Sequence, residues 1–320
     1  VIRVLLGFCL AGVYVTAESW LNNAATNTTR GKIISAYMIA QTSGIIAAQG
    51  LMNLGDAGGY LLFVVPSILV SLSFAPILLS ASPTPAFETD KPMTLRQLYD
   101  SSPLASVGML ILGGIFAAQF GMASVYGAQA GLSVAQISGF VAAIFAGAVA
   151  FQMPIGWLSD RMDRRWLILG VAAVGAVSTG VGAFLGVDFE TLLVLGFVMG
   201  GMASPLYSLF IAYTNDFLEV EDMAAASGGL VFVYGLGAIA GPMVTGQLMD
   251  IVGPHGFWLF LAALFALIAA HATWRMTCRP GVPGDETGAY VGVSPTGSPV
   301  ALAAAQEWYV ETAEESAAED

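Results

Sequence analysis

The sequence predicts an all-α membrane protein that crosses the bilayer about nine times. Hydrophobic residues make up 57% of the 320 positions and charged residues only 10%, and the mean hydropathy of +0.77 is far above that of soluble proteins. Apolar runs of about 20 residues recur along the chain, each long enough to cross the hydrocarbon core as a helix. The runs lack the short alternating segments of a membrane barrel, and backbone polar groups in lipid must be satisfied within the segment. We therefore expect helices.

The nine expected spans place nearly all basic residues on one side of the membrane. The spans cover residues 4–21, 33–53, 60–80, 104–126, 134–158, 166–186, 191–213, 224–250 and 256–274. Nine of the ten Lys and Arg residues fall in alternate connections or after the last span: Arg30, Lys32, Lys91, Arg96, Arg161, Arg164, Arg165, Arg275 and Arg279. Only Arg3 falls on the other side. The positive-inside rule therefore predicts that the C-terminus is cytoplasmic.

The end of the chain differs in composition from the rest. Residues 281–320 hold eight acidic residues and no basic one, and they are rich in Pro, Gly, Ser and Ala. Such a segment cannot bury enough apolar surface to fold by itself. We expect residues 279–320 to form a disordered acidic cytoplasmic tail.

An internal repeat relates the second and third spans to the last two. An ungapped shift of 197 residues gives eight identities in 33 positions, among them Tyr37 with Tyr234 and Gly44 with Gly241. Chance in this composition would give about three. Equivalent helices are then six spans apart, so spans four to nine form one six-helix unit and the first three form the back half of another. The pattern predicts that three further helices precede Val1.

The connection between the fifth and sixth spans carries charged residues in a fixed pattern. The residues Gly156, Asp160, Arg161, Arg164 and Arg165 follow the spacing G-x-x-x-D-R-x-x-R-R. This pattern resembles the cytoplasmic signature of the major facilitator superfamily, although Asp163 stands where that family usually has Gly. Parallel six-helix repeats are also the architecture of this superfamily.

Two stretches near the N-terminus extend the resemblance. Residues 3–7, Arg-Val-Leu-Leu-Gly, are similar to the R-x-x-x-G pattern of the family's fourth helix. Residues 18–22, Glu-Ser-Trp-Leu-Asn, followed by Arg30-Gly31 and Tyr37-Met38, resemble the YcaD-like subgroup. The resemblance covers residues 1 to about 278. It implies a monomeric, multi-pass protein of the plasma membrane, the inner membrane in bacteria, truncated at its N-terminus.

The resemblance also implies a division of the chain into four parts. Residues 1–81 correspond to helices 4–6, the C-terminal part of the first six-helix bundle. Residues 82–102 form the cytoplasmic loop between the bundles, residues 103–278 form the second bundle with helices 7–12, and residues 279–320 are the tail.

The candidate cavity residues lie on spans one, four and seven, which match helices that line the central cavity of the superfamily. Arg3, Tyr14 and Glu18 share one narrow face of span one at about 100° per residue, and ionisable groups there should face a cavity rather than lipid. The cavity or substrate candidates are Tyr14, Glu18, Gln119, Tyr126 and Tyr207. Arg3 and Glu18 are also candidates for ion coupling. The alternatives are that the Tyr and Gln side chains only join helices, and that Glu18 bonds to nearby loop groups.

Two further features suggest conformational roles. Asp160 is expected to pair with Arg164 at i, i+4 and to meet the start of the second span, near residues 28–31, when the two halves close on the cytoplasmic side. The alternative is that the basic residues only anchor this loop on the cytoplasmic side and that the acidic residues among them are incidental. Gly237, Gly241 and Pro242 either allow the eighth span to flex or permit close helix packing.

Other chemistries are not supported. The chain has no phosphate-binding loop, no G-x-S-x-G nucleophile motif and no zinc-protease pair, because its two histidines, His255 and His271, are expected near opposite membrane faces. Basic residues are scattered over loops, so nucleic-acid binding is not expected. We expect no enzyme activity, no metal and no cofactor.

Two function classes remain open. The first is a secondary active transporter that moves a small solute across the bilayer by alternating access, with proton coupling undecided. The second is a non-transporting membrane sensor or scaffold on the same fold, because fold alone does not determine function.

Overall fold

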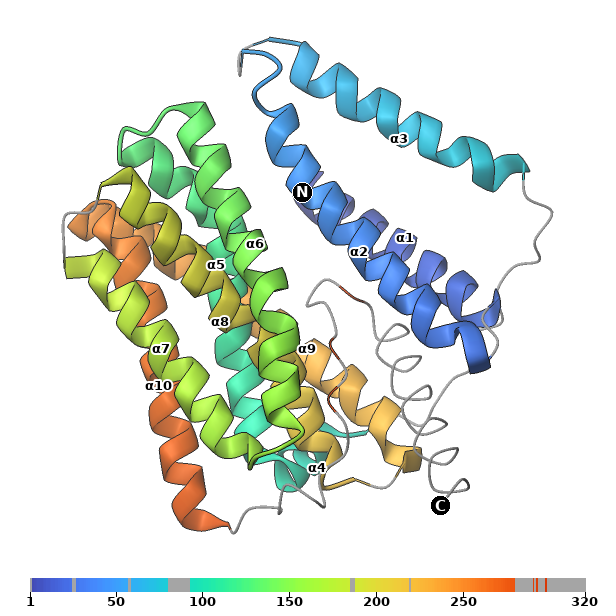
Figure 1. Ribbon diagram of the computed structural model, residues 1–320, viewed down its shortest axis with the longest axis vertical. Coiled ribbons are helices and arrows are strands. Elements are labelled where there is room, and N and C mark those ends of the chain that lie inside the picture. Colours follow the sequence, from blue (N-terminus) through green and yellow to red (C-terminus); the bar gives the residue numbers. More distant parts are fainter. Residues whose placement is uncertain are drawn as a thin grey trace.

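The computed structural model describes residues 2–24, 27–56, 59–79, 93–184, 188–218 and 220–279, together with residues 290, 292 and 297. Every regular element in these ranges is a helix. Figure 1 shows a bundle formed by the helices between residues 103 and 278, with the first three helices on one side of it.

Six long helices form the bundle, and they match the last six predicted spans to within a few residues. They are α5 (Pro103–Gln129), α6 (Val134–Ser159), α7 (Arg164–Phe184), α8 (Phe189–Asn215), α9 (Val220–Val252) and α10 (His255–Cys278). Within the described ranges these six are long and apolar enough to cross a membrane. Six of the nine predicted spans are thereby confirmed.

The first three predicted spans correspond to helices that are less clearly long and apolar enough to cross a membrane. They are α1 (Ile2–Ala24), α2 (Asn27–Leu51) and α3 (Leu61–Leu79). Among the residues whose side chains the structure describes, the apolar stretches in this part of the chain are Leu5–Leu21 and Leu61–Pro76. Polar residues such as Gln41, Thr42 and Ser43 interrupt α2. The helices lie where they were predicted, but the count of nine full spans exceeds the six long apolar helices.

The predicted inter-bundle loop contains a short helix that the hydropathy pattern did not reveal. This helix, α4 (Leu95–Ser101), begins with a reciprocal cap. The Thr94 hydroxyl accepts the backbone N–H of Gln97 at 3.3 Å, and the Gln97 side-chain oxygen accepts the backbone N–H of Thr94 at 3.0 Å. Such a capping box satisfies two donors that a helix start leaves without partners. Leu98 is buried and holds α4 against the bundle.

Pairs of helices build the bundle: α5 packs along α9, α6 along α8, and α7 along α10. Glycines allow the first two pairs to approach closely. A Cβ atom on Gly147 of α6 would overlap the carbonyl oxygen of Phe197 on α8, and one on Gly200 of α8 would overlap that of Ile144 on α6. Small residues at such crossings are how membrane helices gain close contact.

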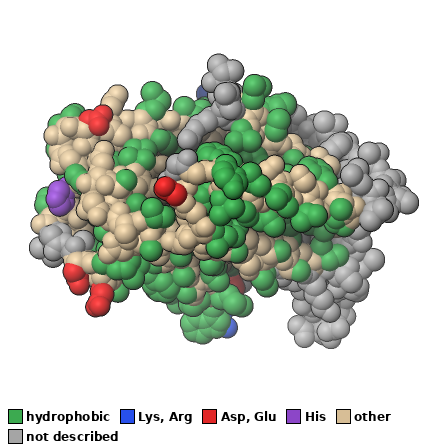
Figure 2. Space-filling model, turned by 90° about the horizontal axis from the view of Figure 1, so that it is seen from above, with side chains coloured by type: hydrophobic (Ala, Val, Ile, Leu, Met, Phe, Trp, Pro, Cys, Tyr) green, Lys and Arg blue, Asp and Glu red, His purple; other side chains and the backbone are tan. Residues whose placement is uncertain are grey.

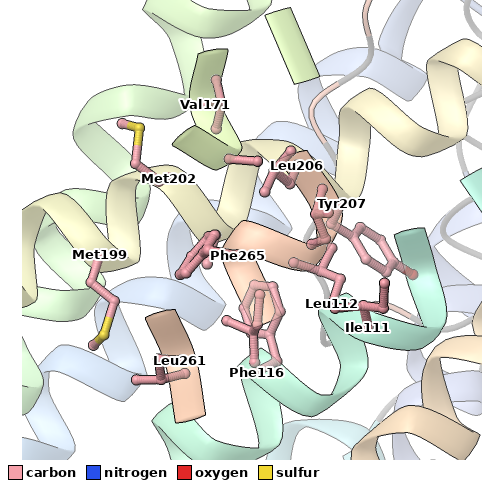
Figure 3. Packing of buried hydrophobic residues seen from close by; sticks show 14 of the residues in the cluster. Ile111, Leu112, Phe116, Val171, Met199, Met202, Leu206, Tyr207, Leu261 and Phe265 are labelled. Atoms are coloured by element: carbon pink, nitrogen blue, oxygen red, sulfur yellow. The ribbon is translucent and has the colours of Figure 1, made fainter. Parts of the chain in front are cut away.

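The core of the bundle is filled by large apolar side chains from several helices. Figure 3 shows Phe116 of α5, Leu206 and Tyr207 of α8, and Phe265 of α10 packed around a common centre. The outside is apolar as well. Figure 2 shows hydrophobic side chains spread over the described surface, with few charges among them. An apolar surface around an apolar core is what lipid as the surrounding solvent requires.

Candidate functional site

The charged motif spans the end of α6 and the start of α7. Asp160 is the C-cap residue of α6 and donates its backbone N–H to Gly156. Asp163 immediately precedes α7, and its carboxylate accepts the backbone N–H of Arg165 at 2.9 Å. A carboxylate at the start of a helix caps a backbone N–H group and is stabilised by the positive end of the helix dipole. Burial alone would raise the pKa of Asp163, but hydrogen bonds and the charge of Arg165 lower it overall.

Asp163 fits the position where the family usually has glycine. None of the described non-glycine residues has a positive φ. The turn therefore needs no left-handed residue here, and the aspartate adds a helix cap that glycine would lack.

Arg164 is the centre of a buried charge network. Its side chain is 1% exposed and forms an ion pair with the carboxylate of Asp216, which is 2% exposed. Its guanidinium also donates to the Ser159 hydroxyl at 3.0 Å and to the Ala212 carbonyl at 3.1 Å. The predicted pair with Asp160 exists, but at 4.0 Å it is the looser contact. The main partner of Arg164 is thus on the last turn of α8.

Arg165 extends the network to the end of α10. Its guanidinium binds both carboxylate oxygens of Asp163 and donates to the carbonyl of Arg279 at 2.6 Å. Arg279 donates in turn to the Ser101 carbonyl at 3.1 Å and lies 3.9 Å from the ring centroid of Phe217. Five helices are therefore joined at this end of the bundle: α4, α6, α7, α8 and α10.

Arg161 is not part of the buried network. It is exposed, lies 4.2 Å from the ring centroid of Trp157 and donates to the Trp157 carbonyl at 2.9 Å. A cation over an indole ring suits the membrane interface.

The side chain of Asp160 is the more exposed of the two partners in its contact with Arg164, at 37%. Its Oδ1 accepts the backbone N–H of Tyr290 at 2.6 Å. The side chains of residues 28–31, its predicted partners, lie outside the described part of the chain. The expected contact with the start of the second span stays a prediction.

A second polar cluster forms where the first helices meet the bundle. Glu18 of α1 is buried and accepts the hydroxyl of Tyr37 on α2 at 2.7 Å. Tyr207 of α8 lies within electrostatic range of the Glu18 carboxylate. The ring of Tyr207 meets that of Tyr234 on α9 edge to face, with centroids 5.4 Å apart. Tyr14 lies within electrostatic range of Tyr37.

Three of the five cavity candidates, Tyr14, Glu18 and Tyr207, are thus gathered in one region. Glu18 bonds to Tyr37 of the neighbouring helix α2. The Tyr207 hydroxyl is buried without a hydrogen-bond partner among the described residues. A buried carboxylate with tyrosines can hold a proton or a polar group of a solute.

Gln119 and Tyr126 lie elsewhere on α5. Tyr126 stacks on Phe257 with centroids 5.0 Å apart and meets Trp258 edge to face at 5.6 Å. Gln119 is buried, and its amide nitrogen has no partner within the described ranges. The surroundings of Tyr126 match the alternative of a tyrosine that joins helices. A cavity role for both residues stays a prediction, and the side chain of Arg3 lies outside the described residues.

The glycines of α9 lie at its crossing with α5. A Cβ atom on Gly237 would overlap the Leu110 carbonyl, and one on Gly241 would come within 2.7 Å of the Gly114 carbonyl oxygen. The close-packing alternative accounts for these glycines. Flexing at Pro242 stays a prediction.

Sequence reasoning did not assign a role to Asp216, Tyr37, Gln152 or Tyr290. Asp216 had a usable signal, because a motif arginine that is buried needs a carboxylate partner and an acidic segment begins there. The contacts of Gln152 and Tyr290 join residues 138 positions apart. No local pattern reveals such a pairing.

Comparison with known proteins agrees with the geometry of the motif. The family model described as Major Facilitator Superfamily matches residues 104–303. An uncharacterized MFS-type transporter of Yersinia pestis (strain Pestoides F) is 27% identical over 266 residues, which are 82% of this chain and 68% of that protein. The uncharacterized MFS-type transporter YcaD of Salmonella arizonae is 23% identical, with the same coverage of 82% and 68%.

The family match covers more than half of the chain, and the relatives confirm the predicted resemblance to YcaD-like proteins. The match identifies a multi-pass membrane protein of a transporter family rather than an enzyme. The chain belongs to the Major Facilitator Superfamily.

Proposed function

We propose that this protein is a secondary active transporter that moves a small solute by alternating access, with Glu18 at its transport site. The observation that supports this proposal is the burial of Glu18 between α1, α2 and the bundle. A carboxylate is costly to bury in a membrane protein, and those that persist mark solute or ion pathways. Gradient-driven solute movement is a function that uses such a group.

The repeat supports a two-bundle arrangement around this site. Tyr37 and Tyr234 are equivalent under the 197-residue shift. Tyr37 bonds to Glu18, and Tyr234 packs on Tyr207 near the same carboxylate. We therefore assign residues 1–81 to one bundle and residues 103–278 to the other, with transport at their junction.

Flux into sealed vesicles tests the proposal with the complete protein as the cell makes it. We expect gradient-driven uptake of at least one solute from a broad panel, and Glu18→Gln should lower its rate at least tenfold, or about 1.4 kcal/mol. Dissipating the proton gradient separates proton coupling from coupling to another ion.

The matched control is Glu190→Gln, which removes an exposed carboxylate from the first turn of α8. Its flux should stay within about twofold of the parent protein. Normal flux in Glu18→Gln would remove Glu18 from the transport site. Silence across the panel would favour the sensor or scaffold alternative.

We further propose that the motif end of the bundle faces the cytoplasm, because the basic residues gather there. The native Cys278 and the α5–α6 turn at Ala130 are both exposed, and α10 and α5 place them at opposite ends of the expected spans. In a Cys9→Ser background on intact cells, an impermeant maleimide should leave Cys278 unlabelled. In a Cys9→Ser, Cys278→Ser background, it should label Ala130→Cys. The opposite labelling pattern would invert the proposed orientation.

A further inference from the structure

Tyr290, twelve residues after the end of α10, docks against the motif end of α6. It packs on the hydrophobic core of the bundle. Its ring occupies the space left by the missing side chain of Gly156, because a Cβ atom there would come within 2.5 Å of the ring carbon Cδ1. The absence of a side chain at Gly156, a glycine of the motif, therefore makes room for an aromatic ring.

Polar groups fix Tyr290 at both ends. Its backbone N–H donates to Oδ1 of Asp160 at 2.6 Å, and its hydroxyl accepts the side-chain amide of Gln152 at 2.9 Å. The hydroxyl also lies within hydrogen-bond range of Ser208. Burial raises the pKa of Tyr290, so the phenol stays neutral and suits this enclosed position.

Gln152 connects the docked ring to the inner face of α8. Its amide nitrogen donates to the Ser208 hydroxyl at 3.0 Å, and its amide oxygen accepts the Ser204 hydroxyl at 3.3 Å. The docked tyrosine therefore covers polar groups that lie between α6 and α8.

The bond from the Tyr290 backbone engages the carboxylate of Asp160 in the motif. Asp160 is the group expected to meet the first helix group when the two halves close. Here its oxygen is taken by the backbone of Tyr290. A carboxylate oxygen engaged by the tail is less available to the other half of the protein, so the two contacts compete.

We propose that Tyr290 is an intramolecular plug that holds the bundle in one state. Docking covers the Gln152–Ser204–Ser208 cluster and engages Asp160, and withdrawal of the tail frees both. The site accepts an aromatic residue, supplied by this protein's own C-terminal segment. The proposal concerns regulation and goes beyond transport itself.

The test measures access and protection, so it needs no substrate. The full chain, with Cys9→Ser and Cys278→Ser, carries Ser204→Cys as a reporter in lipid nanodiscs. We expect Tyr290→Ala to raise the rate of maleimide reaction at the reporter at least about fivefold, because removal of the ring uncovers the Gln152–Ser204–Ser208 cluster. Tyr99→Ala removes an exposed tyrosine of α4 and should leave the rate within about twofold.

A second measurement keeps the test independent of the reporter. Gly156→Ala fills the space that the ring occupies, so deuterium exchange of the peptide containing Tyr290 should become at least about tenfold faster. Tyr290→Phe keeps the ring and loses the Gln152 bond, so it should fall between the parent protein and Tyr290→Ala in reporter rate. Equal reporter rates for the parent protein and Tyr290→Ala, or unchanged exchange in Gly156→Ala, would overturn the plug. Either result leaves the transport proposal standing.

Discussion

Replacing Asp216 with alanine should lower the free energy of unfolding by about 3–5 kcal/mol, because it removes the enclosed carboxylate that faces the buried guanidinium of Arg164. Both side chains of this pair are almost fully enclosed, at 1% and 2% exposure. Of the other described partners of Arg164, the Ser159 hydroxyl and the Ala212 carbonyl carry no charge, and the carboxylate of Asp160 is 4.0 Å away and 37% exposed. Reversible unfolding in mixed detergent micelles measures the loss.

The chain offers a matched control in the ion pair between Arg96 and Asp100. These side chains are 92% and 68% exposed and 3.9 Å apart. Asp100→Ala should therefore cost no more than about 1 kcal/mol. Equal losses for Asp100→Ala and Asp216→Ala would show that the buried network does not brace this end of the bundle.

A single methyl group at Gly147 should also destabilise the bundle, by about 1–3 kcal/mol. The added Cβ of Gly147→Ala would overlap a backbone carbonyl of α8. A helix backbone cannot move aside as the flexible end of a side chain can. The reciprocal position Gly200 is equally tight. The same unfolding assay measures the effect, and Gly200→Ala should give a loss of similar size.

Gly170 of α7 provides the comparison for this glycine. No heavy atom lies within 4 Å of a Cβ built there. Gly170→Ala should be neutral or raise the free energy of unfolding by up to about 1 kcal/mol, because alanine favours helix more than glycine does. A loss at Gly170 as large as that at Gly147 would attribute the effect to helix-interior glycine in general, not to the α6–α8 crossing.

The bundle helices were predictable because the thickness of the bilayer sets their length. The predicted run 134–158 became α6 at Val134–Ser159, and 256–274 became α10 at His255–Cys278. The helix α4 was missed since its start depends on the Thr94–Gln97 cap rather than on hydropathy. The long apolar character expected of the second span is weakened by polar residues inside α2.

The candidate site was predictable where helical periodicity applies. The face shared by Tyr14 and Glu18 follows from spacing along one helix. The pairing of Arg164 with Asp216 joins residues 52 positions apart, and helical spacing instead favoured Asp160 as the partner. Residue type alone does not separate Tyr126 from Tyr207. Tyr126 stacks on Phe257 of α10, whereas Tyr207 meets Tyr234 of α9.

The contact between Arg279 and Ser101 brings together the two ends of the chain segment that forms the bundle. Ser101 ends α4, just before α5 begins, and Arg279 follows the last turn of α10. Adjacent termini are a common property of autonomous domains, which tolerate insertion, duplication and permutation. A polypeptide from Thr94 to Arg279 retains both partners of this closure, so the bundle has the anatomy of a module that can be copied as a unit, as the 197-residue repeat in the sequence suggests.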